Sequence, residues 1–150
     1  MREEIIAWTM VWEGCFSLAK SSKNQKGTGT PYYRPSLQIT NTNKELLDRF
    51  QQVVGCGKID LRVKEDRKMN CKAKYAWRVN TQKDIKNICE SILPFLPAKK
   101  EQAELLLEYC ILRLNTKLKG VKLIFGETTR TKREEEIYKR IKELNKRGVR

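Results

Sequence analysis

The sequence predicts an α+β domain in which helices cover one face of a four-stranded antiparallel sheet and the other face is open. Two pairs of segments alternate polar and apolar residues as strands do, and a polar stretch joins the members of each pair. Segments with apolar residues at helical spacing precede, separate and follow these pairs. The resulting order is αββαββα followed by further helices, and 150 residues suit one domain.

The N-terminal part of the chain predicts a buried helix and two strands. Residues 3–13 are apolar nearly all round, which is typical of a helix buried on several sides. Residues 15–20 then alternate as a strand, and after a polar loop a second strand runs near 32–40. Pro35 indicates an edge or irregular position in that strand. We expect the following side chains to share the apolar face: Phe16, Leu18, Tyr33, Pro35, Leu37 and Ile39.

A second helix and a hairpin come next. Asn43 is a suitable N-cap for a helix that runs through Val54. Residues 58–64 and 71–79 alternate as strands, and the polar stretch 65–70 forms the turn between them. The expected apolar side of this hairpin consists of Ile59, Leu61, Val63, Cys71, Ala73, Tyr75, Trp77 and Val79.

The C-terminal part predicts three more helices. Thr81 caps a helix that runs to about Leu93, where prolines break the chain. A longer helix is expected over about 98–118, followed by a loop or short extended piece over 120–126. The last helix, over about 132–146, is mostly charged.

The domain organisation and location follow from length and from the absence of targeting segments. We expect one core over about 3–118 and a C-terminal helical extension over about 127–150. No apolar run approaches the roughly 18 residues that would span a membrane, and the N-terminus lacks the pattern of a signal peptide. We therefore expect an intracellular protein, in the cytoplasm of a prokaryote or in an organelle, with no membrane partner.

Charge predicts a polyanionic partner. Lys and Arg outnumber Asp and Glu by 32 to 18, which gives a formal net charge of +14. Such an excess favours binding to nucleic acid, because phosphate contacts release condensed counterions. The alternative is a solvated surface of the thermophilic type, which is rich in Lys and Glu.

Cysteine and histidine usage restricts the chemistry. The five cysteines form no C-x-x-C pair and histidine is absent, so a zinc site of the usual type is not expected. Without histidine, Ser-His and Cys-His nucleophile pairs are excluded. If the chain is an enzyme, carboxylates, lysines and a bound metal must carry the reaction.

The open face of the predicted sheet is basic. Its strand positions bear Arg, Lys, Gln and Ser, which supply the donors and acceptors that read base edges in a major groove. The residues expected to bind DNA, including neighbouring loop positions and Lys100 as a phosphate contact, are Ser17, Ser21, Lys23, Arg34, Ser36, Gln38, Lys58, Asp60, Arg62, Lys64, Lys72, Lys74, Arg78 and Lys100.

Four segments together resemble the LAGLIDADG homing endonuclease family, of the single-motif, homodimeric type. The sequence IAWTMVWEGCF over 6–16 resembles the family's motif helix and following strand. LQITN over 37–41 resembles its second strand, and LPFL over 93–96 with KKEQA over 99–103 resembles its proline turn, basic pair and next helix. KELNKRG over 142–148 resembles the tails of prokaryotic members, and order and spacing agree over about residues 5–115.

The resemblance implies a catalytic site. Glu13 falls on the family's metal-binding acid, with the Gly14 backbone carbonyl as a second ligand for Mg²⁺ or Mn²⁺. Lys99 falls on the active-site lysine, which stabilises phosphate charge or helps to activate water. Asn41 falls on a position that orients metal-bound water, although it is equally suited to capping the helix after it.

The resemblance also implies an assembly and a substrate. One motif supplies one essential carboxylate, so a homodimer joined through helix 3–13 would cut both strands of a long pseudo-palindromic duplex. Trp8 and Trp12 depart from the consensus, which has small residues at these positions. We expect Ala7 and Val11 to make the nearest approach, with the tryptophans flanking the contact or pointing into each subunit's own core.

Two other functions remain open on the sequence. An RNA maturase for intron splicing would keep the basic sheet without needing the acid, so the presence of Glu13 favours cleavage. A non-catalytic DNA-binding regulator on the same scaffold is favoured by Trp8 and Trp12, because altered helix packing would misplace the two acids.

Overall fold

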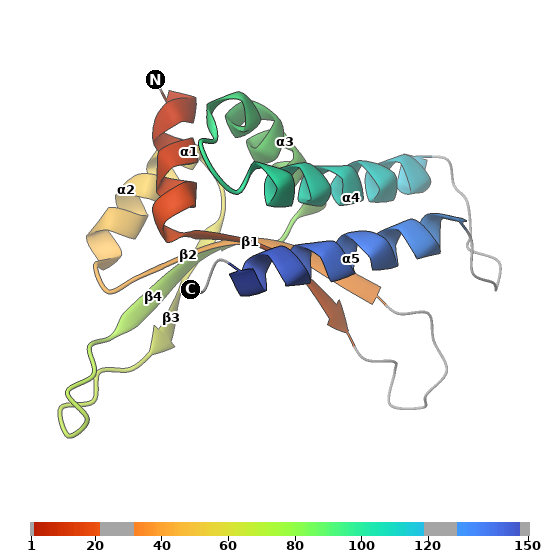
Figure 1. The fold of residues 1–150 in the computed structure, drawn as a ribbon. Coiled ribbons are helices and arrows are strands. Elements are labelled where there is room, and N and C mark those ends of the chain that lie inside the picture. The colour runs from red at the N-terminus through yellow and green to blue at the C-terminus, as the bar shows by residue number, and fades with distance from the viewer. Residues whose placement is uncertain (1, 22–31, 119–128, 148–150) are drawn as a thin grey trace.

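The computed structural model describes residues 2–21, 32–118 and 129–147, and it confirms the predicted α+β architecture. The predicted loop over 120–126 and Lys23 lie outside the described residues. The elements in chain order are α1 (Arg2–Glu13), β1 (Gly14–Ser21), β2 (Tyr32–Asn41), α2 (Lys44–Val54), β3 (Lys58–Val63), β4 (Lys74–Val79), α3 (Gln82–Ile92), the 3₁₀ turn η1 (Leu93–Phe95), α4 (Lys100–Leu118) and α5 (Thr129–Arg147) (Figure 1).

The sheet is antiparallel with strand order β1-β2-β4-β3. Pairing places Cys15 beside Gln38, Gln38 beside Arg78 and Arg78 beside Lys58, so one row of side chains crosses all four strands. The pairing of β2 with β4 begins at Leu37. Pro35 therefore lies where β2 pairs only with β1, which is why a residue without an N–H donor is accommodated there.

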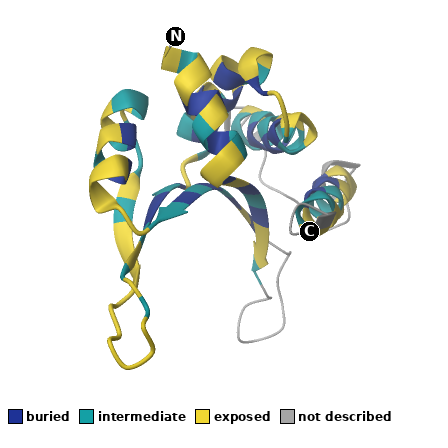
Figure 2. Cartoon of the chain, turned by 60° about the vertical axis from the view of Figure 1, so that its left-hand side comes forward, coloured by how far each residue is buried: buried dark blue, intermediate teal, exposed yellow. Residues whose placement is uncertain are grey.

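The helices lie over one face of the sheet, and the other face is open. In Figure 2 the sheet arches beneath the helical layer, and none of the described helices crosses its concave side. The core between sheet and helices contains large side chains with almost no exposed surface, among them Met10, Phe16, Leu37, Trp77 and Leu106. The apolar-inside assignment of β1 and β2 is confirmed.

Two predicted helix caps have different outcomes. Asn43 is the N-cap of α2, because its side-chain oxygen accepts the Leu46 N–H at 3.3 Å, and Gly55 ends this helix in the left-handed conformation. Thr81 precedes α3 in extended backbone, but its side chain makes no capping hydrogen bond. Its carbonyl instead accepts the Ile85 N–H.

The hairpin differs from the sequence-based expectation. β4 begins at Lys74, and Cys71 forms only an isolated bridge with Asp66. Leu61 and Val63 are 49% and 40% exposed, so their predicted place on a buried face is wrong. The reason is geometric: the hairpin extends beyond the helical layer, and its register shifts between Leu61 and Val63 (Figure 1).

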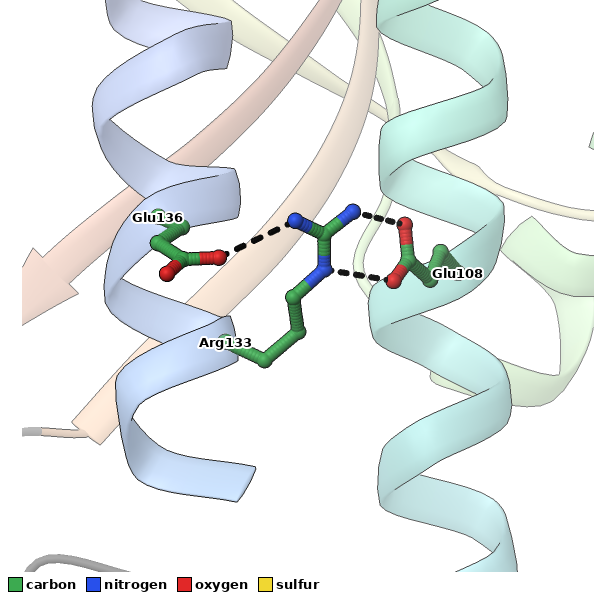
Figure 3. Close-up of polar contacts among 3 residues, drawn as sticks. All are labelled: Glu108, Arg133 and Glu136. Atoms are coloured by element: carbon green, nitrogen blue, oxygen red, sulfur yellow. Dashed lines mark hydrogen bonds and ion pairs between the residues drawn. The ribbon is translucent and has the colours of Figure 1, made fainter. Parts of the chain in front are cut away.

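The charged helix α5 packs beside β1 and α4. Ile137 and Ile141 are buried in the common core, and the Asn145 side-chain amide donates to the Phe16 carbonyl at 2.9 Å. Figure 3 shows how Arg133 joins the helices: its guanidinium donates two hydrogen bonds to Glu108 on α4 and one to Glu136. The acidic residues of α5 are therefore used largely within the helical layer.

Glu135 connects α5 to β1 and β2. Its carboxylate accepts hydrogen bonds from Lys20, at 2.8 Å, and from the Tyr33 hydroxyl. These two donors hold the pKa of Glu135 below its ordinary value. A depressed pKa means that the contribution to stability is present above the unfolded-state pKa and is lost as the pH falls through the folded-state pKa.

We expect Glu135→Gln to lower the free energy of unfolding by about 1 kcal/mol near pH 7, since it removes a charge-assisted pair that is partly screened by solvent. The difference from wild type should close as the pH falls below about 4. Urea unfolding at several pH values measures this. Glu104→Gln, at an exposed site on α4, is the control, and a difference for Glu135→Gln that stays constant with pH would contradict the assignment.

Candidate active site and nucleic-acid interface

Glu13 is presented to solvent by an abrupt change from helix to strand. α1 ends at Glu13 and β1 begins at Gly14. A Cβ atom at Gly14 would lie 2.5 Å from the Met10 carbonyl oxygen and 2.7 Å from the Met10 Cα, so only glycine fits this turn. The Glu13 side chain, which precedes Gly14, is exposed, and its carboxylate forms no ion pair with the residues that the structure describes.

A pocket of about 300 Å³ joins Glu13 to the ends of two strands. Asn41 closes β2 and contributes to this pocket. Its side-chain oxygen accepts the Asn43 N–H at 2.8 Å, and Asn43 rather than Asn41 caps α2. The amide NH₂ of Asn41 is thus the end that can donate to a ligand. The complete lining is Glu13, Thr40, Asn41, Thr42 and Lys74.

Lys99, which directly precedes α4, contacts the junction between α1 and β1. Its ammonium donates to the Gly14 carbonyl at 2.7 Å. The Lys99 backbone has a φ of 58°, a left-handed conformation that costs a residue with a Cβ about 1 kcal/mol. Burial raises the pKa of the neighbouring Cys15 thiol, and the positive charge of Lys99 opposes that rise.

The structure therefore brings together the three side chains predicted to be catalytic. Glu13 and Asn41 share one pocket, and Lys99 is attached to the carbonyl of the residue that follows Glu13. Lys100 is exposed at the first position of α4. Within the described ranges, no three Cys, Asp or Glu side chains gather as a ready metal cluster.

The open sheet face carries the residues expected to read DNA. Side chains at these positions are exposed or half-buried, while their neighbours along each strand are buried on β1 and β2. Arg78 forms an ion pair with Asp60 at 3.2 Å, and the Gln38 amide donates to Thr40 at 3.1 Å. On this face or in the adjoining hairpin lie Ser17, Ser21, Arg34, Ser36, Gln38, Lys58, Asp60, Arg62, Lys64, Lys72, Lys74 and Arg78.

Thr40, Thr42 and Lys74 are the pocket residues that sequence reasoning did not assign to catalysis. Lys74 was expected only to contact DNA as one of many basic sheet residues. The available signal was position: Thr40 and Thr42 flank Asn41, and Lys74 comes one residue before Tyr75, the pairing partner of Asn41.

The exposed side of α1 is aromatic. Ile5, Trp8 and Trp12 are 51%, 50% and 76% exposed and share one side of the helix by their spacing. Val11, expected together with Ala7 to make the nearest approach to a partner helix, is half-buried and packs against the core of its own subunit. Ala7 has no exposed surface, so its part of that expectation is wrong. Its methyl group is used in the core of its own subunit, together with Ile6 and Met10.

Comparison with known proteins agrees with this architecture. Residues 13–110 match the family model described as LAGLIDADG endonuclease. No curated protein sequence matches the chain significantly. The helices of the described ranges include none with the length and apolar character needed to cross a bilayer.

Solved structures share the fold. The homing endonuclease I-CvuI, in complex with the I-CreI target in the presence of Mg, has a TM-score of 0.62 and 19% identity, covering 94% of each chain. The archaeal intron-encoded homing endonuclease I-Vdi141I, complexed with DNA, has a TM-score of 0.62 and 18% identity, covering 94% of this chain and 96% of that one. I-SmaMI, bound to uncleaved DNA with calcium ions, has a TM-score of 0.66 and 14% identity, and the match covers 95% of this chain and 45% of I-SmaMI.

The family match covers most of the chain and includes the acid at the end of α1, β1 to β4 and the first part of α4. The chain belongs to the LAGLIDADG endonuclease family.

Proposed function

We propose that the protein is a metal-dependent homing endonuclease that binds a long duplex site along its open sheet and cuts both strands as a homodimer. The observation that carries this proposal is the position of Glu13. Its carboxylate has no ion-pair partner among the described residues, and it lines a pocket with Thr40, Asn41, Thr42 and Lys74 where α1 meets the sheet. Basic side chains on the concave face would place a phosphate backbone beside that pocket.

The residues present fit Mg²⁺. This ion is commonly held by one or two carboxylates together with substrate phosphates and water, so a protein site need not be a complete cage. Glu13 supplies the anionic ligand, and the Gly14 carbonyl keeps a second lone pair although it accepts from Lys99. A bound divalent cation would supply charge stabilisation for phosphodiester hydrolysis and a water of lowered pKa.

The other pocket residues act by position and charge. Lys99 has three N–H donors, of which one is engaged by Gly14, so the others can bind a phosphate oxygen as charge develops there. The amide NH₂ of Asn41 is the end of the side chain left to donate to a ligand, because its oxygen accepts the Asn43 N–H. This fixed orientation suits it to hold a phosphate oxygen or a water molecule.

A second copy of the chain would supply the second site. The described pocket contains one carboxylate, whereas cutting two strands requires hydrolysis at two phosphates. The exposed stripe of Ile5, Trp8 and Trp12 is the largest apolar feature of α1 and ends beside Glu13. Pairing two stripes about a two-fold axis would bury them and bring both pockets to the centre of a pseudo-palindromic site.

Glu13→Gln should abolish metal-dependent cleavage and leave specific DNA binding within about tenfold, because it removes cation affinity but few DNA contacts. The substrate is a duplex obtained by selection from a randomised library, and cleavage is followed with Mg²⁺ or Mn²⁺. Glu104→Gln should cut at the wild-type rate. A wild-type protein that binds the selected duplex without cutting it would instead identify a non-catalytic DNA-binding protein.

Replacing Lys99 separates its chemical and backbone effects. Lys99→Ala and Lys99→Gly both remove the ammonium, and each should slow single-turnover cleavage by about 10²-fold. Glycine tolerates the left-handed backbone, so the glycine variant should be more stable than the alanine variant by about 1 kcal/mol. Urea unfolding and cleavage rates measure the two effects. Cleavage by Lys99→Ala within threefold of wild type would remove Lys99 from the active site.

The double variant Trp8→Ala/Trp12→Ala should weaken dimerisation by about 10²-fold or more, because large aromatic side chains dominate the binding energy of interfaces. Sedimentation over a range of protein concentrations measures this. Met69→Ala, at a hairpin side chain that is 79% exposed, should leave self-association unchanged. Equal dimerisation by wild type and the tryptophan variant would place the interface elsewhere.

A further inference from the structure

Lys74 lines the same pocket as Glu13, which distinguishes it from the other basic residues of the open sheet face. It is the first residue of β4, and it lines the pocket together with Glu13 and Asn41. Pairing explains this position: Asn41, at the end of β2, lies opposite Tyr75, so the preceding residue comes next to the strand end. Its partner on the other side is Val63, beyond which the hairpin leaves the sheet.

The two charged groups of the pocket remain separate. Lys74 and Glu13 line the same pocket of about 300 Å³ but form no ion pair with each other. The Lys74 ammonium also makes no hydrogen bond or ion pair with any residue that the structure describes, whereas the Lys99 ammonium donates to the Gly14 carbonyl. The pocket thus offers a carboxylate on one side, an uncommitted ammonium on the other, and the polar side chains of Thr40, Asn41 and Thr42 with them.

This layout matches the charges of a metal–phosphate pair. A cation bound at Glu13 and a phosphate between it and Lys74 would compensate both protein charges, and the polar groups can satisfy the remaining oxygens. An ammonium acts well as a point charge toward phosphate. Arg78, in contrast, is paired with Asp60 and lies in the row of side chains that crosses the sheet.

We propose that Lys74 is a catalytic residue that binds a non-bridging oxygen of the phosphate to be cut. In the hydrolysis a bond forms between a water oxygen and phosphorus, and the bond from phosphorus to the leaving oxygen breaks. Lys74 gives up no proton in this step, and it stabilises the negative charge on the phosphoryl oxygens. The inference rests on the proposed function. It assigns Lys74 to the phosphate that is hydrolysed, whereas the sequence analysis assigns it only to DNA binding.

A double-mutant cycle between protein and DNA tests the contact without requiring cleavage. The probe is the duplex obtained by selection, prepared as a series in which one central linkage at a time is an uncharged methylphosphonate. Binding is measured without divalent metal for wild type, Lys74→Met and Lys68→Met. Lys68 is exposed in the hairpin turn and outside the pocket, so its replacement removes the same charge from the same hairpin.

At one central linkage, the methylphosphonate should weaken DNA binding about tenfold for the wild type and for Lys68→Met. For Lys74→Met the same methylphosphonate should weaken binding less than twofold, because the contact to that phosphate is already lost. With Mg²⁺ and unmodified duplex, Lys74→Met should cut about 10²-fold more slowly, and Lys74→Arg should recover part of the loss. Thermal unfolding should be unchanged, since the side chain is exposed.

The outcomes separate the two proposals. If every central linkage affects wild type and Lys74→Met equally, the Lys74 contact is rejected while the endonuclease function stands. If Lys74→Met cuts within threefold of wild type, its catalytic role is rejected in the same way. If selection yields no duplex that the wild type binds specifically, the proposed function itself is rejected. The proposed contact between Lys74 and a DNA phosphate is then rejected with it.

Discussion

The close approach of Gly14 to Met10 is the constraint on which the candidate active site depends. Because glycine has no Cβ to collide with Met10, the chain can pass directly from α1 into β1 at Gly14. The turn fixes Glu13 at the helix end and aims the Gly14 carbonyl at Lys99, which itself accepts a left-handed backbone to reach it. A site held between a helix and a sheet is positioned more precisely than one on a loop.

Charge is divided between the two faces of the protein. In the helical layer, acids are paired across α4 and α5, as with Arg133 and Glu108 or Arg140 and Glu101. On the open sheet face Arg78 forms an ion pair with Asp60. The acids Glu134, Glu135 and Glu136 of α5 pair with Arg113 of α4, Lys20 of β1 and Arg133 of α5, respectively.

Regular elements could be predicted because their signals are local. Alternation identified the apolar faces of β1 and β2, and side-chain chemistry identified the Asn43 cap. The hairpin was misjudged because Leu61 and Val63 alternate like core residues, and only the extent of the helical layer decides whether anything covers them. The pocket role of Lys74 was missed for a related reason: register, which sequence does not reveal, brings it next to Asn41 and Glu13.

The burial of Ala7 has a consequence for the proposed two-fold pair. Ala7 packs inside its own subunit, so the large exposed apolar side chains left on α1 for a partner helix are Ile5, Trp8 and Trp12. The distance between two packed helices depends on the side chains at their contact. Indole rings on two successive turns of α1 would hold the two helix axes apart, unless the rings pack into grooves on the partner helix. Because Trp12 directly precedes Glu13, the packing of its ring would set the separation of the two carboxylates. The spacing between the two cuts would then be governed by an aromatic contact and not by a close backbone approach.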